Sequence, residues 1–160
     1  SVNGLGWVLV EFNDMMIFPN TEEIFAQMRN AGMGVIVTHP ERNWLLRKDI
    51  DRLERWVSGG AYMQVTGGSL LGVFGTDARK FAEALMAKGL VHFLASDAHD
   101  LDRRSPRLDH VRAHVAERYG EEYAEALLCT HPQAVIEGRA LHHGTLEPPE
   151  PAKRWFQFWR

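Results

Sequence analysis

Four residues of metal-binding types lie at or just beyond the ends of apolar runs in this sequence: Glu11, His39, Asp97 and His99. Mixed carboxylate and imidazole ligands suit zinc, manganese or iron better than calcium or magnesium. Asp97 and His99 are two residues apart, so an extended backbone would point both side chains the same way. The four residues therefore predict a metal site, provided that the fold gathers them.

Each of the four also has an ordinary explanation. A glutamate at the end of a strand is commonly a surface residue or a helix-cap partner, and a lone histidine before a proline is commonly structural. An Asp-x-His triplet also arises by chance. The shared place of these residues after apolar runs is what favours a site over these explanations.

Arginines accompany the candidate ligands. Arg42 follows His39 by three residues, and Arg103, Arg104 and Arg107 follow the last candidate ligand within eight. The planar guanidinium binds phosphate oxygens bidentately and stabilises charge during phosphoryl transfer. The alternative, which we favour for at least two of the four arginines, is solvated charge in surface salt bridges.

Four apolar, β-branched runs predict strands, and the amphipathic stretches between and after them predict helices. This alternation implies parallel strands with right-handed crossovers, and hence an α/β layer or barrel, although four strands are too few to close a barrel. The candidate ligands would lie at the carboxyl ends of the strands, where such folds gather functional groups. The predicted strands are residues 7–12, 35–38, 61–65 and 91–95, and the predicted helices are residues 20–32, 48–57, 76–88, 107–118, 121–129 and 132–137.

Two further features of the sequence are of types that can carry chemistry. The glycine-rich segment 66–72 could present backbone amides to an anion, but it lacks the Lys-Ser/Thr ending of a nucleotide-binding loop, so a tight strand-to-helix turn is favoured. Cys129 lies in an apolar helical run, which favours a buried small side chain. No arginine occurs in residues 130–135, which argues against a cysteine-dependent phosphatase.

Composition restricts the class of protein. The 160 residues are 45% apolar and 24% charged, with a net charge of −3, which argues against nucleic acid as a partner. No apolar run is long enough to span a membrane, no signal-peptide pattern opens the chain, and a single cysteine excludes an intrachain disulfide. We therefore expect a cytoplasmic protein, with one domain over residues 1–144 and a proline-rich linker and aromatic tail over residues 145–160.

Several runs together resemble a known family. Residues 8–12, 37–42, 67–75 and 89–99 resemble, in the same order, the bacterial PHP-domain tyrosine phosphatases of capsule and exopolysaccharide gene clusters. Residues 119–124 and 132–138 fit the same pattern, so that the resemblance covers about residues 5–140.

The resemblance implies that the chain is the later part of a PHP-type distorted (β/α)7 barrel. It also implies a cluster of up to three divalent metal ions in a complete domain and fewer in this chain, with manganese in the first place and iron or zinc as alternatives. The implied substrate is the phosphorylated, tyrosine-rich tail of a kinase that controls polysaccharide export. Carried over by position, the metal ligands are Glu11, His39, Asp97 and His99, and the residues that hold phosphate and assist catalysis are Arg42 and Arg104.

The family's opening His-x-His motif has no counterpart in this sequence. Two other functions therefore stay open. One is a PHP-type phosphoesterase for a small monoester such as histidinol phosphate. The other is a catalytically incomplete fragment that serves as an interaction or oligomerisation module, because missing strands would leave open sheet edges that favour self-association.

Overall fold

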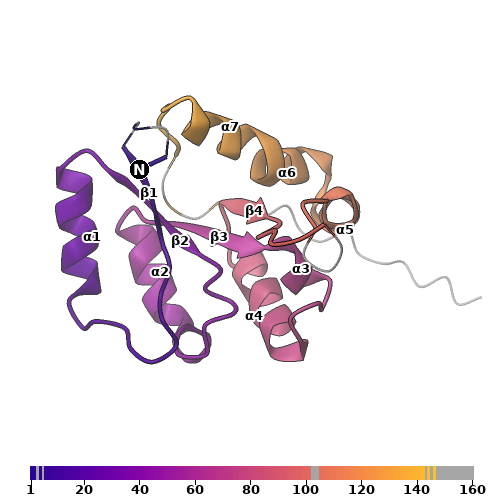
Figure 1. Ribbon diagram of the computed structural model, residues 1–160, viewed down its shortest axis with the longest axis horizontal. Coiled ribbons are helices and arrows are strands. Elements are labelled where there is room, and N and C mark those ends of the chain that lie inside the picture. The colour runs from indigo at the N-terminus through magenta and orange to yellow at the C-terminus, as the bar shows by residue number, and fades with distance from the viewer. Residues whose placement is uncertain (3, 5, 102–104, 143, 145, 147–160) are drawn as a thin grey trace, which may run out of the picture.

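Four short apolar runs form one parallel sheet at the centre of the computed structural model (Figure 1). The order across the sheet follows the chain, β1-β2-β3-β4, and all three pairings are parallel. The predicted strands and their parallel arrangement are thus confirmed. The strands are β1 Trp7–Val10, β2 Gly34–Thr38, β3 Tyr62–Thr66 and β4 Phe93–Ala95. The structure describes residues 1–2, 4, 6–101, 105–142, 144 and 146.

The helices connect and follow the strands nearly as the sequence predicts. The three crossovers of the sheet contain α1, α2 and α4, and the last strand is followed by a run of helices that ends with α7. The helical segments are α1 Thr21–Asn30, a 3₁₀ turn η1 Leu46–Lys48, α2 Ile50–Ser58, α3 Gly67–Leu70, α4 Thr76–Ala87, α5 Asp109–Tyr119, α6 Glu121–Glu125, a π-helical turn η2 Ala126–Thr130 and α7 His131–Ile136.

One local prediction is confirmed and another was wrong. β3 ends at Thr66 and α3 begins at Gly67, which is the predicted tight strand-to-helix turn, and a Cβ on Gly67 would lie 2.7 Å from Val111 of α5, so the glycine permits close packing. Cys129 is exposed rather than buried. It lies in the wide turn η2, where Leu127 takes the inward position and Cys129, two residues later, faces outward.

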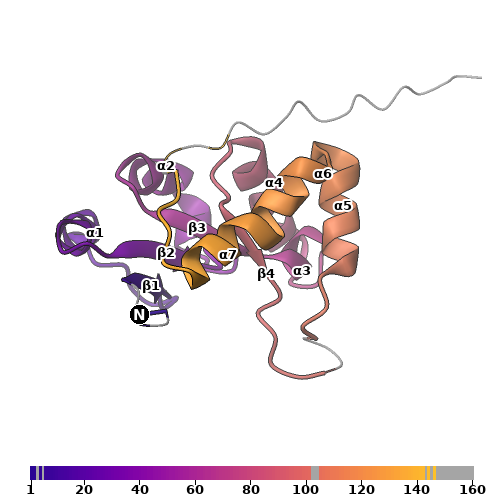
Figure 2. The same cartoon turned by 90° about the horizontal axis from the view of Figure 1, so that it is seen from above.

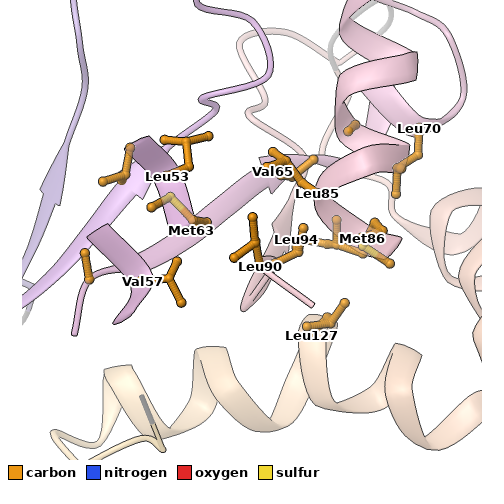
Figure 3. Close-up of a cluster of buried hydrophobic side chains, with 14 of the residues drawn as sticks. Leu53, Val57, Met63, Val65, Leu70, Leu85, Met86, Leu90, Leu94 and Leu127 are labelled. Atoms are coloured by element: carbon orange, nitrogen blue, oxygen red, sulfur yellow. The ribbon is translucent and has the colours of Figure 1, made fainter. Parts of the chain in front are cut away.

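The main core lies between one face of the sheet and α1, α2 and α4 (Figure 1). Alternate strand residues point to this face, so Met63 and Val65 of β3 pack against Leu53 of α2 and Leu85 of α4, as Figure 3 shows. All four side chains are fully buried. This packing fixes the strands, and with them the positions from which the candidate ligands project.

The opposite face of the sheet is crossed by α6 and α7 (Figures 1 and 2). Here Tyr62 and Phe93 pack with Val135 of α7 in a smaller cluster. Leu9 of β1 points to the same face and is 52% exposed. No helix in the described part of the chain is long and apolar enough to cross a membrane.

Candidate metal and phosphate site

Two candidate ligands meet where β1 and β2 end. Val10 pairs with Val37 in the parallel register, so both strands reach the same edge of the sheet. Glu11 Oε1 then lies 3.5 Å from His39 Nε2. The backbone N–H of His39 also donates to Gln64 O of β3 at 2.7 Å, which anchors the histidine to the next strand. The fold therefore brings together two residues that are far apart in the sequence.

The other two candidate ligands follow β4. His99 Nδ1 lies 2.9 Å from the backbone oxygen of Asp97 and 4.0 Å from its carboxylate. A carbonyl oxygen only accepts, so Nδ1 carries the proton and the lone pair stays on Nε2, the arrangement of a metal-binding histidine. The prediction of an extended backbone was wrong, because Asp97 has φ of 50°. A turn, rather than strand alternation, brings the two residues together.

The backbone is strained at both pairs. His39 (φ 36°) and Asp97 (φ 50°) are the non-glycine residues of the described chain with positive φ. This conformation costs an L-residue about 1–2 kcal/mol. Strain of this kind persists where the surrounding structure enforces it, and it is concentrated at functional sites. Two candidate ligands thus occupy strained backbone positions, which lower the stability of the fold.

Arg42 links the two pairs. It follows His39 by three residues, and its Nη1 contacts Asp97 Oδ2 beyond β4. Its guanidinium also lies over the ring of Phe74, 4.5 Å from the centroid. The cation is therefore held between an aromatic face and a carboxylate at the edge where the candidate ligands lie.

Of the other three candidate arginines, the structure describes one. Arg103 and Arg104 lie outside the described residues. Arg107 forms two hydrogen bonds of 3.0 Å to the carboxylate of Asp109, and these bonds hold the pKa of Asp109 below its usual value. Both side chains are exposed, so Arg107 fits the alternative of a solvated surface charge.

The donor types fit a transition metal, but the described residues offer them in two pairs. No three histidine, cysteine or carboxylate side chains within that part of the chain lie close enough together to hold a metal ion. One imidazole and one carboxylate from each pair would suit zinc, manganese or iron. The arrangement is therefore two pairs of candidate ligands with the Arg42 cation between them.

Two buried polar residues that the sequence analysis did not select support this edge. Asn43 Nδ2 donates to Phe12 O at 3.1 Å and to Asn13 O at 3.2 Å, which ties the segment after Glu11 to the segment after His39. Glu41 is fully buried, and its carboxylate accepts hydrogen bonds from Thr66 at the end of β3 and from Ser69 of α3. Burial raises the pKa of Glu41, while these hydrogen bonds act in the opposite direction.

No local sequence pattern singles out Glu41 and Asn43. Charged and amide side chains on both sides of an arginine are ordinary in an exposed loop, and sequence periodicity does not show that such a loop is buried. Burial of a polar side chain requires a hydrogen-bond partner, and these partners are 25 to 31 residues away along the chain.

The parallel sheet, with candidate metal ligands and an arginine at the carboxyl ends of its strands, is typical of a PHP-type α/β domain. The chain belongs to the CpsB/CapC family of capsular polysaccharide synthesis, whose model matches residues 1–137. The resemblance inferred from the sequence is thus confirmed.

Particular relatives agree with this assignment. The tyrosine-protein phosphatase YwqE of Bacillus subtilis (strain 168) is 29% identical over 154 residues, which are 96% of this chain and 59% of YwqE. The CapC protein of Staphylococcus aureus is 37% identical over 103 residues, 64% of this chain and 40% of that protein. The chain therefore spans less than two thirds of the length of these relatives.

A solved structure shows the same fold. It comes from the crystal structures of YwqE from Bacillus subtilis and CpsB from Streptococcus pneumoniae, described as unique metal-dependent tyrosine phosphatases. The match has a TM-score of 0.82 and 28% identity, and it covers 93% of this chain and 59% of the solved one. The predicted fold class, part of a PHP-type α/β domain with four parallel strands, is confirmed.

Proposed function

We propose that this chain forms part of a metal-dependent protein-tyrosine phosphatase of capsule or exopolysaccharide synthesis. The observation that carries the proposal is Arg42, which follows the candidate ligand His39 and contacts the candidate ligand Asp97. A cation in this place would hold a phosphate group beside the metal site. The family and the names of the relatives support the same reaction.

Each site residue has a separate role in this proposal. The ligands from the ends of β1 and β2 would hold one side of the metal site, and those beyond β4 the other. We propose manganese as the metal, with iron or zinc as the alternatives. Arg104, which lies outside the described residues, would be the second arginine. The proposed ligands are Glu11, His39, Asp97 and His99.

The chemistry divides between the metal and the chain. A bound divalent metal supplies Lewis acidity, which makes water a nucleophile near neutral pH and neutralises charge on phosphate. The guanidinium of Arg42 would bind two phosphate oxygens and orient the ester for in-line attack. Because the cation stacks on Phe74, its direction is fixed before the substrate arrives.

The proposed substrate is a phosphotyrosine in the tail of a bacterial tyrosine kinase that regulates polysaccharide synthesis. The test is hydrolysis, in the presence of Mn²⁺, of a phosphotyrosine peptide, the matching phosphoserine peptide and histidinol phosphate by the purified chain. Preference for the phosphotyrosine peptide supports the proposal. Preference for histidinol phosphate would favour the small-molecule phosphoesterase. A stable oligomer that neither binds metal nor hydrolyses any ester would favour the interaction module.

Arg42→Ala tests the arginine itself. Loss of a group that stabilises charge in the transition state lowers turnover by about 100-fold or more, and metal content should stay unchanged. Arg79→Ala is a matched control, because Arg79 pairs with Glu83 on the exposed side of α4. An equal loss of bound metal in Arg42→Ala would contradict the role given to Arg42.

A further inference from the structure

Glu41 is a buried carboxyl group with a specific set of contacts. Its side chain is fully buried, and Oε1 accepts hydrogen bonds from the Thr66 backbone N–H at 3.1 Å and from Ser69 Oγ at 2.8 Å. Within the described residues, Oε2 has no hydrogen-bond partner. Burial of such a group opposes folding unless its contacts compensate. An apolar side chain of similar size would fill the same space without this cost, so packing alone does not explain a carboxyl group here.

The contacts join two segments that both reach the candidate site. Glu41 lies between His39 and Arg42, whereas Thr66 ends β3 and Ser69 lies in α3. The Glu41 carboxyl therefore ties the segment after β2 to the segment after β3. β3 lies between β2 and β4 in the sheet and carries no candidate ligand at its own end.

The backbone around Glu41 is held as well. The Arg42 N–H donates to His39 O at 3.0 Å and closes a turn. Arg47 Nη1 donates to the backbone oxygens of Glu41 at 3.1 Å and of Arg42 at 2.8 Å. The Glu41 side chain thus connects this turn to the segment that contains Thr66 and Ser69. Movement of the Glu41 carboxyl would therefore move the backbone of Arg42.

The second segment matters because it carries the aromatic ring under Arg42. Phe74 lies four residues after the end of α3, and its ring lies 4.5 Å from the Arg42 guanidinium carbon. Cβ of a side chain at Gly68 in α3 would come within 3.2 Å of that ring, so α3 and Phe74 are packed together. Glu41 consequently holds both the backbone of Arg42 and the segment that carries Phe74, whose ring lies against the Arg42 guanidinium.

We infer that Glu41 is a positioning residue, whose carboxyl sets the placement of Arg42 and His39 through Thr66 and Ser69. The catalytic part of this inference rests on the proposed phosphatase function, but the placement itself does not. Supporting residues of this kind change ligand affinity or activity by about 10–100-fold when they are removed.

The experiment compares Glu41→Ala, Glu41→Gln and Ser69→Ala in the full chain. Glutamine keeps an oxygen that accepts both hydrogen bonds, so it should rescue what alanine loses. Tyr62→Phe is the matched control, because it removes one hydrogen bond of 3.0 Å, from the Tyr62 hydroxyl to Leu141 O, at the other end of β3. Two measurements are made on each protein: NMR signals of the Arg42 Nε–H and the His39 ring, and kcat/KM for a phosphotyrosine peptide.

The expected result is a shift of the Arg42 and His39 signals in Glu41→Ala with a loss of about 10–100-fold in kcat/KM. Glu41→Gln should resemble the wild type, and Tyr62→Phe should move neither signal.

If Glu41→Ala does not fold, Ser69→Ala should give a smaller shift of the same signals. The inference would be overturned if the Arg42 and His39 signals did not move in folded Glu41→Ala. If Glu41→Ala does not fold, unmoved signals in folded Ser69→Ala would overturn it. The same shift in Tyr62→Phe would overturn it as well. Absence of hydrolysis by the wild-type chain would instead count against the proposed function, and the NMR comparison would still decide the role of Glu41.

Discussion

The two ends of the sheet use histidine in opposite ways. At the amino end, His92 is buried and both ring nitrogens are bonded: Nδ1 accepts from Met63 N–H at 3.1 Å and Nε2 donates to Gly144 O at 2.9 Å. At the carboxyl end, His99 uses one nitrogen for a backbone oxygen and is 58% exposed at the side chain. A histidine whose two nitrogens are satisfied by backbone is structural, whereas one with a lone pair directed away from the backbone can bind a ligand.

The backbone conformation also differs between the two ends of the sheet. At the amino end, positive φ among the described residues occurs only at glycines, whereas at the carboxyl end His39 and Asp97 have positive φ. In parallel α/β folds the amino end serves stability and the carboxyl end carries chemistry. This chain shows that division with the same residue type at both ends.

The largest expected effect concerns the amino end and acid pH. Burial lowers the pKa of His92 to about 4, below the usual value of about 6.5 for the unfolded chain. Between these values the unfolded state binds the extra proton, so the titration of His92 should lower the free energy of unfolding by about 3 kcal/mol as pH decreases from about 6.5 to 4. Urea unfolding from pH 7.5 to 4 measures this fall.

His92→Gln is the control for this titration, because glutamine does not bind a proton in this range. Burial raises the pKa of Glu41, so its contribution has the opposite sign: stability rises as pH falls. That contribution is present in both proteins, and the difference between them isolates His92. Equal slopes for wild type and His92→Gln would show that His92 does not differ from the exposed histidines.

A smaller effect is expected at the carboxyl end. In His39→Gly, relief of the positive φ gains about 1–2 kcal/mol, whereas the flexibility of glycine in the unfolded chain costs about 0.5–1 kcal/mol. With the loss of side-chain contacts, the free energy of unfolding should change by less than about 1 kcal/mol. Chemical denaturation at pH 7.5 measures this change.

Gln64→Gly is the matched comparison, since Gln64 is a half-buried polar residue of β3. It has no positive φ to relieve, so this variant should lose about 1 kcal/mol or more. If His39→Gly were the more destabilised of the two, the backbone at His39 would not be the strained, functional position inferred from its φ.

The sequence predicted the strands well because apolar, β-branched runs are a local signal, and parallel order then placed Glu11 and His39 at one edge. It could not predict contacts that depend on tertiary structure. The turn at Asp97 and the burial of Glu41 depend on residues far along the chain, and the outward direction of Cys129 depends on a π-helical turn that periodicity does not reveal.

The central claim is that the carboxyl end of this sheet binds a divalent metal through residues of two pairs. Calorimetric titration of the metal-free chain with Mn²⁺ tests it most directly, with His39→Ala and Asp97→Ala as test variants and Tyr62→Phe as the control. We predict saturable binding by the wild type and by Tyr62→Phe, and affinity at least about tenfold lower in both test variants. Equal Mn²⁺ affinity in wild type, His39→Ala and Asp97→Ala would contradict the account.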